Sequence, residues 1–284
     1  MGDHVTIYEV GPRDGLQNEA QAIPTKDKIA LINALSQTCL KKIEVSSFVS
    51  PKWVPQLADA ADVFAGIKRA DGVTYSALVP NEKGLAAAEA AGADEIALFA
   101  SASEGFSQKN TNGSIAQVLD RARNLAQKTK LPLRGYVSCI DKCPYDGPTA
   151  PDAVLKVAME LLDIGCFEIS LGDTIGQAPP DNIARLLDHL LKQIAPNQLA
   201  GHFHDTSGQA LENVAVSLDR GIRTFDSAVG GLGGCPYAPG AKGNLSTLSL
   251  LDFLDKQGFE TGVDMGGIQA AQDILLSWEL GNKA

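Results

Sequence analysis

The segment His202-Phe203-His204-Asp205 carries two imidazole side chains two residues apart, at the end of the apolar run Leu199 to Phe203. Such a run is typical of a β-strand, where side chains two apart point to the same face, about 7 Å from each other along the backbone. Two imidazoles on a rigid strand can form half of a metal site. The triplet alone also fits a half-buried polar strand end, so further ligands must come from elsewhere in the chain.

Other reactive side chains collect at the ends of similar apolar runs. In a barrel of parallel strands, chemistry is carried by the loops that follow the strands. The candidates are Arg13, Asp14 and Gln17 after the first run, Glu44 within the second, Asp173 after the sixth, and Cys235 and Asn244 after the eighth.

Eight apolar runs predict eight strands, separated by segments with helical periodicity. The strands are expected at Val5–Val10, Lys42–Ser46, Thr74–Val79, Glu95–Ala100, Leu133–Ser138, Phe167–Leu171, Leu199–His204 and Thr224–Ala228. The clearest helical segment is Asp181–Ile194, and others are Asp27–Cys39, Ala86–Ala93, Gln209–Arg220 and Gly267–Leu280.

This alternation predicts an α/β fold, a closed (β/α)₈ TIM barrel with an additional C-terminal helical segment, and we expect residues 1–284 to form one catalytic domain. An open, doubly wound sheet is the alternative. Only the barrel brings the first strand beside the eighth. In that case Asp14, His202, His204 and Asn244 supply two nitrogens and two oxygens to one divalent cation, either Mg²⁺, Mn²⁺ or Fe²⁺, with Zn²⁺ as a further option.

Composition excludes several classes of partner. The chain has 24 Lys and Arg against 34 Asp and Glu, a net charge of −10, which argues against nucleic acid. No apolar run approaches the ~20 residues of a membrane span.

The 5 cysteines, an odd count, and the lack of a leader pattern around Met1–His4 predict reduced thiols in a cytoplasmic protein. Cys39 and Cys166 lie in apolar contexts and are expected in the core.

Each candidate also has a structural interpretation. Glu44 lies in an apolar strand and needs a partner, so a buried salt bridge to Arg13 competes with a catalytic role. Asp173 and Thr174 fit a cap of the next helix. Lys109 and Asn110 fit a solvated loop.

Four segments resemble motifs of the 3-hydroxy-3-methylglutaryl-CoA lyase family, within a wider group of metal-dependent barrel lyases and synthases. They are VGPRDGLQNE at 10–19, GDTIG at 172–176, HFHDT at 202–206 and GLGGCPYAPGAKGNL at 231–245. The wider group shares the arginine–aspartate pair and the paired histidines. The loop with Cys235 distinguishes the lyases, and the resemblance covers nearly the whole chain.

The resemblance implies cleavage of 3-hydroxy-3-methylglutaryl-CoA to acetyl-CoA and acetoacetate, in leucine breakdown or ketone-body formation, with Mg²⁺ or Mn²⁺ as cofactor. Asp14 or His202 would accept the hydroxyl proton, and the sequence leaves both open as the general base. Arg13 would stabilise the enolate oxygen, and Cys235 would protonate the carbanion. Glu44 would orient Arg13, and Asp173 would assist near the substrate.

The resemblance also implies substrate-binding residues and a form of assembly. Gln17, Lys109, Asn110 and Ser114 are expected to bind the acyl-CoA substrate. The family resemblance implies a homodimer, without a terminal disulfide because no cysteine lies near Ala284. Two other functions stay open: a transferase that joins acetyl-CoA to a 2-oxo acid, and a non-catalytic protein that binds a metal or CoA esters.

Overall fold

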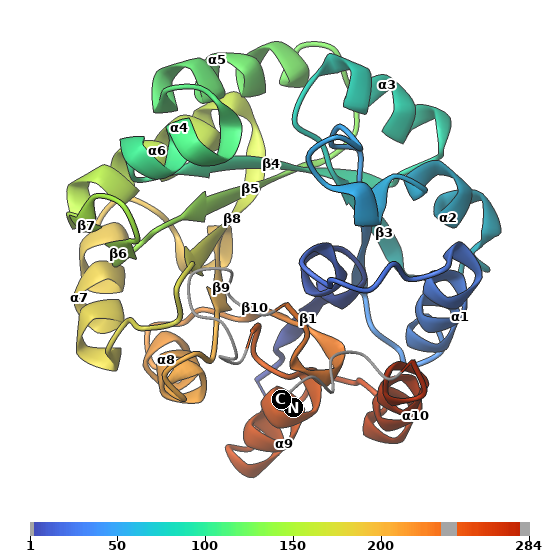
Figure 1. Ribbon diagram of the computed structural model, residues 1–284. Coiled ribbons are helices and arrows are strands. Elements are labelled where there is room, and N and C mark those ends of the chain that lie inside the picture. Colours follow the sequence, from blue (N-terminus) through green and yellow to red (C-terminus); the bar gives the residue numbers. More distant parts are fainter. Residues whose placement is uncertain (1–2, 234–242, 279–284) are drawn as a thin grey trace.

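The computed structural model describes residues 3–233 and 243–278. Within these residues eight parallel strands close into a barrel surrounded by helices (Figure 1). The strands are β1 (Thr6–Glu9), β2 (Lys42–Ser47), β3 (Thr74–Leu78), β4 (Glu95–Ser101), β5 (Leu133–Ser138), β8 (Cys166–Asp173), β9 (Leu199–Phe203) and β10 (Thr224–Ser227).

The first strand closes the ring. β1 pairs in parallel with β2 on one side and with β10 on the other, with Tyr8 opposite Lys42 and Asp226 respectively. All eight predicted strands are therefore confirmed in one closed barrel, and the open sheet is wrong. The consequence for the site is that the loops after β9, β10 and β1 leave the barrel side by side.

Helices connect successive strands and cover the outside of the barrel (Figure 1). They are α1 (Thr25–Leu35), α2 (Ala60–Gly66), α3 (Glu82–Ala90), α4 (Glu104–Thr111), α5 (Ile115–Ala126), α6 (Pro151–Ile164), α7 (Pro180–Leu190), α8 (Ala210–Leu218), α9 (Thr247–Lys256) and α10 (Met265–Leu276). Short 3₁₀ turns are η2 (Pro55–Leu57), η3 (Pro196–Gln198) and η4 (Val229–Gly231), and a small antiparallel ribbon is formed by β6 (Lys142–Cys143) and β7 (Gly147–Pro148). The predicted additional C-terminal helix is α10, which packs against α1 and α9.

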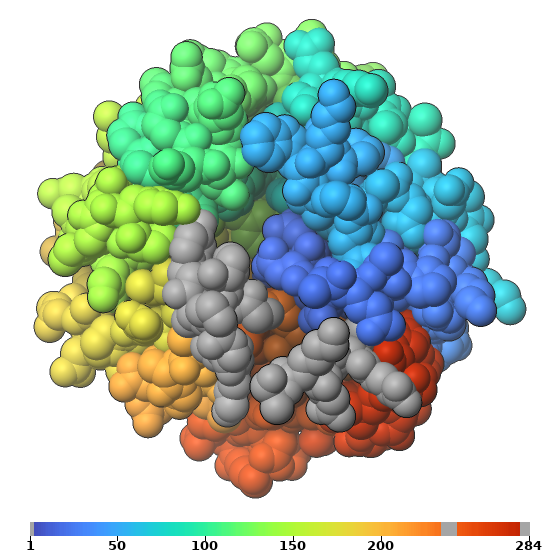
Figure 2. All heavy atoms as spheres, in the orientation of Figure 1, coloured from blue at the N-terminus to red at the C-terminus, as the bar shows by residue number. Residues whose placement is uncertain are grey.

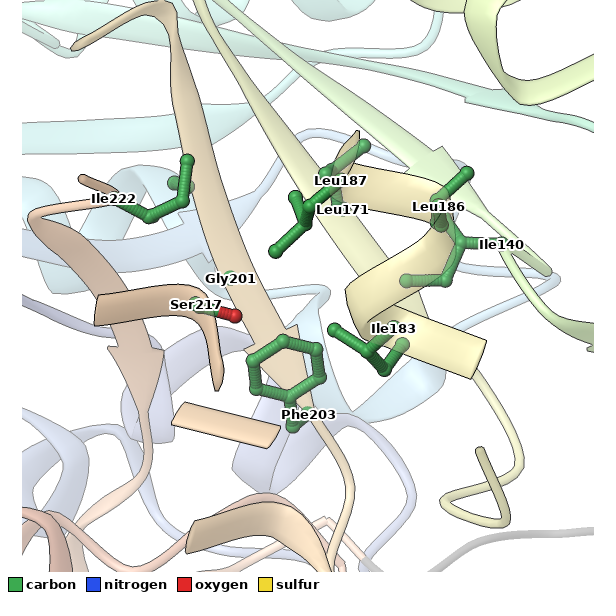
Figure 3. Close-up of a pocket in the computed structure, with 10 residues that line it drawn as sticks. Ile140, Leu171, Ile183, Leu186, Leu187, Gly201, Phe203, Ser217 and Ile222 are labelled. Atoms are coloured by element: carbon green, nitrogen blue, oxygen red, sulfur yellow. The ribbon is translucent and has the colours of Figure 1, made fainter. Parts of the chain in front are cut away.

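The core lies between the barrel and its helices. Helix α7 buries Ile183, Leu186, Leu187 and Leu190, the stripe that its periodicity predicts. Ile183, Leu186 and Leu187 line an apolar gap of about 10 Å³ together with side chains of β8 and β9, among them Leu171 and Phe203 (Figure 3). A gap of this size is at the lower limit for a single water molecule, and its apolar lining makes it part of the core packing.

Several helix ends differ from the predictions for local reasons. Helix α1 stops at Leu35 rather than Cys39, because Gln37 N and Thr38 N donate to carbonyl oxygens only three residues back, and Cys39 then adopts a left-handed conformation with φ of 65°. Cys39 is also exposed, so its expected place in the core is wrong, whereas Cys166 is buried. Helix α3 starts before Ala86 because the Asn81 side chain caps it by accepting a hydrogen bond from Gly84 N.

Among the described residues, no helix is both long enough and apolar enough to cross a membrane.

Candidate active site

A pocket of about 1090 Å³ opens at the carboxyl ends of the barrel strands. The face of the molecule seen in Figure 2 is hollowed near its centre. This is the end of a barrel that carries active sites, and the volume is large enough for an extended ligand. Its lining includes seven of the predicted site residues: Arg13, Asp14, Gln17, Lys109, Asn110, His202 and His204.

Arg13 and Asp14 lie on a single π-helical turn, η1 (Gly11–Gly15), directly after β1. The backbone N–H groups of Arg13, Asp14 and Gly15 all donate to the carbonyl oxygen of Val10, at 3.1, 2.8 and 3.2 Å. Gly11 is required here because a Cβ atom would lie 2.5 Å from Oε1 of Glu9. The turn thus fixes two adjacent charged side chains at the rim of the barrel.

Arg13 is held by two carboxylates. Its Nε atom donates to Oε2 of Glu44 at 2.6 Å, and its Nη1 atom donates to Oδ1 of Asp14. The ion pair expected between Arg13 and Glu44 is therefore present. No described residue accepts a hydrogen bond from Nη2 of Arg13, which leaves that nitrogen as a donor for a ligand.

Tyr136 completes the surroundings of Arg13. Its ring lies under the guanidinium, 5.2 Å from the centroid, and its hydroxyl donates to Oε2 of Glu44 at 3.2 Å. The same ring meets the His202 imidazole edge-on, with centroids 6.0 Å apart. Tyr136 also lines the pocket, although it was not among the predicted site residues.

Asp14, His202 and His204 converge on one point, although they come from opposite ends of the chain. Oδ2 of Asp14 lies 3.8 Å from Nε2 of His202 and 3.9 Å from Nε2 of His204. Their candidate ligand atoms all lie within 4.8 Å of one another. Burial would raise the pKa of Asp14, but Arg13 and the two histidines hold it well below the usual value. Asp14 is therefore an anion at neutral pH.

Asn244 lies beside this group. It pairs with His204 through a backbone bridge, and its Nδ2 donates to Oδ2 of Asp14 at 2.8 Å and to the Leu232 carbonyl at 3.1 Å. The amide nitrogen, rather than the oxygen, thus faces Asp14. The predicted role of the Asn244 oxygen as a metal ligand stays a prediction.

Asp173 ends β8 as a buried carboxylate. Its Oδ2 accepts a hydrogen bond from Ala178 N at 2.9 Å, and its Oδ1 has no hydrogen-bond partner among the described residues. Burial raises its pKa. Asp173 does not cap helix α7, because the residue before that helix is Pro179.

The predicted substrate-binding segment is only partly at the pocket. Lys109 and Asn110 line it, near the end of α4. Ser114 instead caps α5: its hydroxyl accepts from Gln117 N at 3.2 Å, and Gln117 Oε1 accepts from Ser114 N at 2.9 Å. Cys235 lies outside the described residues.

Glu9, which was not among the predicted site residues, is a fully buried carboxylate that joins three segments. Its Oε1 accepts from Gly11 N at 2.8 Å and from Val229 N at 2.9 Å, and its Oε2 accepts from the Thr247 hydroxyl at 2.6 Å. Glu9 therefore connects the turn that carries Arg13 and Asp14 to the turn η4 after β10 and to the start of α9. The segment that contains Cys235 lies between these two elements in the sequence. A carboxylate within an apolar strand was the available signal.

The donor set of Asp14, His202 and His204 fits a divalent cation. One ionised carboxylate and two imidazoles, without thiolate, are ligands for Mn²⁺, Fe²⁺ or Zn²⁺, and carboxylate-rich variants of such sites take Mg²⁺. The three side chains lie at the wall of the pocket rather than in the closed core, so a ligand in the pocket could reach the same cation.

Comparison with known proteins gives a consistent result. The family model described as HMGL-like matches residues 4–275. The chain is 51% identical over 278 residues to the cytoplasmic 3-hydroxy-3-methylglutaryl-CoA lyase of Rattus norvegicus, covering 97% of this chain and 81% of the rat protein. It is 53% identical over 274 residues to the 3-hydroxy-3-isohexenylglutaryl-CoA/hydroxy-methylglutaryl-CoA lyase of Pseudomonas aeruginosa, covering 95% and 91% of the two chains. The crystal structure of the HMG-CoA lyase from Brucella melitensis superposes with a TM-score of 0.96 at 54% identity, covering 97% and 99%.

Proposed function

The chain belongs to the HMGL-like family and is a lyase, and we propose that it cleaves 3-hydroxy-3-methylglutaryl-CoA to acetyl-CoA and acetoacetate with a divalent cation, Mg²⁺ or Mn²⁺. The observation that carries the proposal is the convergence of Asp14, His202 and His204 beside Arg13 on the wall of one large pocket. Asn244 is the expected fourth ligand. When bound, a divalent cation lowers the pKa of a hydroxyl group placed against it.

The reaction breaks a carbon–carbon bond after the substrate hydroxyl loses a proton. Asp14 and His202 are the candidates for the base, because both line the pocket at the proposed metal site. Bond cleavage leaves negative charge on the thioester oxygen of the acetyl-CoA enolate. Arg13 is suited to stabilise that oxygen, because Glu44 and Asp14 fix its guanidinium while Nη2 remains available.

Proton return to the enolate carbon is the proposed role of Cys235. A thiol with an ordinary pKa of ~8.5 is mostly protonated at neutral pH and can act as a donor. Asp173 has a buried, raised-pKa carboxyl near the same strand ends, which suits an assisting hydrogen-bond or proton donor. Gln17, Lys109 and Asn110 are proposed to contact the acyl-CoA from the pocket wall.

Product analysis tests the proposal. Enzyme stripped with EDTA and then supplied with Mg²⁺ or Mn²⁺ is incubated with 3-hydroxy-3-methylglutaryl-CoA, and acetoacetate and acetyl-CoA are quantified. We expect equal amounts of the two products, only with added cation. Absence of acetoacetate with either cation would overturn the proposal. Incubation with acetyl-CoA and 2-oxo acids is the control for the bond-forming alternative, and we expect no release of free CoA.

We propose further that the chain acts as a cytoplasmic homodimer in leucine breakdown or ketone-body formation. The name of the rat relative, a cytoplasmic lyase, supports the proposed location, and the family resemblance supports the proposed dimeric state. The chain mass of 29.8 kDa makes light scattering decisive between monomer and dimer.

A further inference from the structure

His202 has a buried carboxylate on the side of its ring that faces away from Asp14. Asp226 lies on β10, directly opposite His202 of β9 in the strand register. Oδ2 of Asp226 is 3.0 Å from Nδ1 of His202, whereas Nε2 of His202 faces Oδ2 of Asp14 at 3.8 Å. The two ring nitrogens of His202 therefore have different partners, one inside the barrel and one at the pocket.

Asp226 is itself fixed from two other strands. Arg134 of β5 donates from Nη2 to Oδ1 at 2.7 Å and from Nη1 to Oδ2 at 3.2 Å. Ser170 of β8 donates from its hydroxyl to Oδ2 at 2.7 Å. The fork of Arg134 contacts both carboxylate oxygens, which holds the carboxylate plane in one orientation.

Arg134 cannot easily move to follow a shift of Asp226. Its side chain is fully buried, its Nε donates to Oε2 of Glu168 at 2.8 Å, and its guanidinium stacks 4.0 Å from the centroid of the Tyr8 ring. The row from Glu168 through Arg134 to Asp226 thus crosses the inside of the barrel beneath the candidate metal ligands. None of these residues has a role in the function proposed above.

The charges of this row decide which nitrogen of His202 carries hydrogen. Asp226 is flanked by an arginine and by a hydroxyl that already donates to it, so towards His202 it acts as an acceptor. An acceptor at Nδ1 requires a hydrogen on Nδ1, which leaves the lone pair of the neutral ring on Nε2.

We infer that Asp226, held by Arg134, is a positioning residue that fixes His202 as the Nδ1–H tautomer, so that Nε2 is presented to a divalent cation at Asp14 and His204. The part of this inference that concerns the cation rests on the function proposed above. Carboxylates that accept the second N–H of a metal-binding histidine commonly raise metal affinity ~10–100-fold.

The Nδ1–H tautomer of His202 also distinguishes the two candidate bases. In this tautomer, Nδ1–H of His202 donates to Asp226, and the Nε2 lone pair faces the proposed cation site. A His202 that held a cation through Nε2 would therefore have no free lone pair to accept a proton. The base in the loaded enzyme is then Asp14 or a group that it orders, and His202 serves as a ligand.

Nitrogen NMR tests the tautomer without any variant of Asp226. The chain contains 4 histidines. A His4→Gln/His189→Gln protein labelled with ¹⁵N-histidine shows only His202 and His204, and adding His204→Gln identifies the His202 signals. In metal-free protein, at a pH where the ring is neutral, we expect a protonated Nδ1 and an unprotonated Nε2. The reverse assignment would overturn the inference.

Metal binding tests the consequence. We expect Asp226→Asn to weaken Mn²⁺ binding, measured by calorimetry, ~10–100-fold. Ser170→Ala is the matched control, because it removes a hydroxyl contact to the same oxygen and keeps Arg134 and His202 in place. We expect Ser170→Ala to weaken Mn²⁺ binding less than Asp226→Asn does, because the Asp226 carboxylate keeps its contacts with Arg134 and His202. Circular dichroism establishes that each variant is folded, and if Asp226→Asn does not fold, the tautomer assignment in the protein with native Asp226 decides.

The outcomes separate this inference from the proposed function. Wild-type protein that binds no Mn²⁺ would contradict the proposed metal dependence and the link to a cation made here. Wild-type binding with an unchanged affinity in folded Asp226→Asn would overturn this inference alone.

Discussion

The Nε atom of Arg13 lies 2.6 Å from Oε2 of Glu44, so a buried guanidinium is fixed against a buried carboxylate at the wall of the pocket. Asp14 holds a second nitrogen of the same group. An arginine fixed at two nitrogens pays little entropic cost when its third nitrogen binds a developing negative charge. This arrangement connects the turn after β1 with the chemistry proposed for the pocket.

Replacing Arg13 by lysine keeps the positive charge but removes the planar fork. We expect Arg13→Lys to lower kcat ~10²–10³-fold, because one ammonium cannot contact Glu44 and Asp14 and still face the substrate. Mn²⁺ affinity should change little, since Asp14 keeps a cationic neighbour. Steady-state kinetics and Mn²⁺ calorimetry on the same preparation measure both quantities. A kcat near that of the wild type would remove Arg13 from the reaction.

Loss of one imidazole should abolish the cation site. We expect His204→Ala to weaken Mn²⁺ binding by more than the ~10–100-fold that follows from loss of a supporting partner, because a direct ligand is removed. His189→Ala is the matched control, since His189 lies on α7 and pairs with Asp152 at 2.8 Å away from the pocket. Elemental analysis after dialysis measures the bound metal. Equal metal content in the two variants would exclude His204 as a ligand.

Cys235 should affect turnover without affecting the cation. We expect Cys235→Ser to lower kcat ~10²–10⁴-fold, the range for loss of a positioned proton donor, because a hydroxyl is a far weaker acid than a thiol. Mn²⁺ affinity should match that of the wild type, since the cysteine is not among the proposed ligands. Retention of wild-type turnover would place the proton donor elsewhere.

The stability of the protein in acid should depend on Asp226. Burial would raise its pKa, but Arg134 and His202 outweigh burial and lower the pKa from 3.8 to about 2. A folded-state pKa below the unfolded value stabilises the protein above about pH 4, and this stabilisation is lost as the pH falls from 3.8 towards 2. The shift corresponds to about 2 kcal/mol of unfolding free energy.

Urea unfolding of the wild type and of Asp226→Asn measures this contribution. The difference in unfolding free energy between the two proteins should shrink by about 2 kcal/mol as the pH falls from 5 to about 2, because the variant lacks the titrating group. A difference that stays constant with pH would contradict the low pKa of Asp226.

The strands and the main ligand set were predictable from the sequence for a clear physical reason. Strands that are buried on both faces have short apolar runs in their sequences, and each of the eight predicted runs forms a strand of the barrel. The closed ring then brings His202, on the seventh strand, beside Asp14, after the first. Helix ends were less predictable, because they depend on single residues such as the left-handed Cys39 and the capping Asn81.

The supporting residues were missed although the sequence held a signal for them. Glu44 was predicted as a site residue because a carboxylate in an apolar strand needs a partner. The same reasoning applies to Arg134 in β5 and to Asp226 in β10, which prove to be partners of each other at 2.7 Å. Their pairing could not be read from the sequence, since it depends on strand order and on which face of each strand points into the barrel. Tyr136 gave no signal, because a tyrosine in a strand is ordinary.

The most direct test of the cation site is anomalous diffraction from crystals grown with Mn²⁺. We predict one strong anomalous peak within bonding distance of a carboxylate oxygen of Asp14 and of Nε2 of both His202 and His204. A map with no peak between these three side chains, from protein that binds Mn²⁺ in solution, would contradict the metal centre from which the proposed reaction follows.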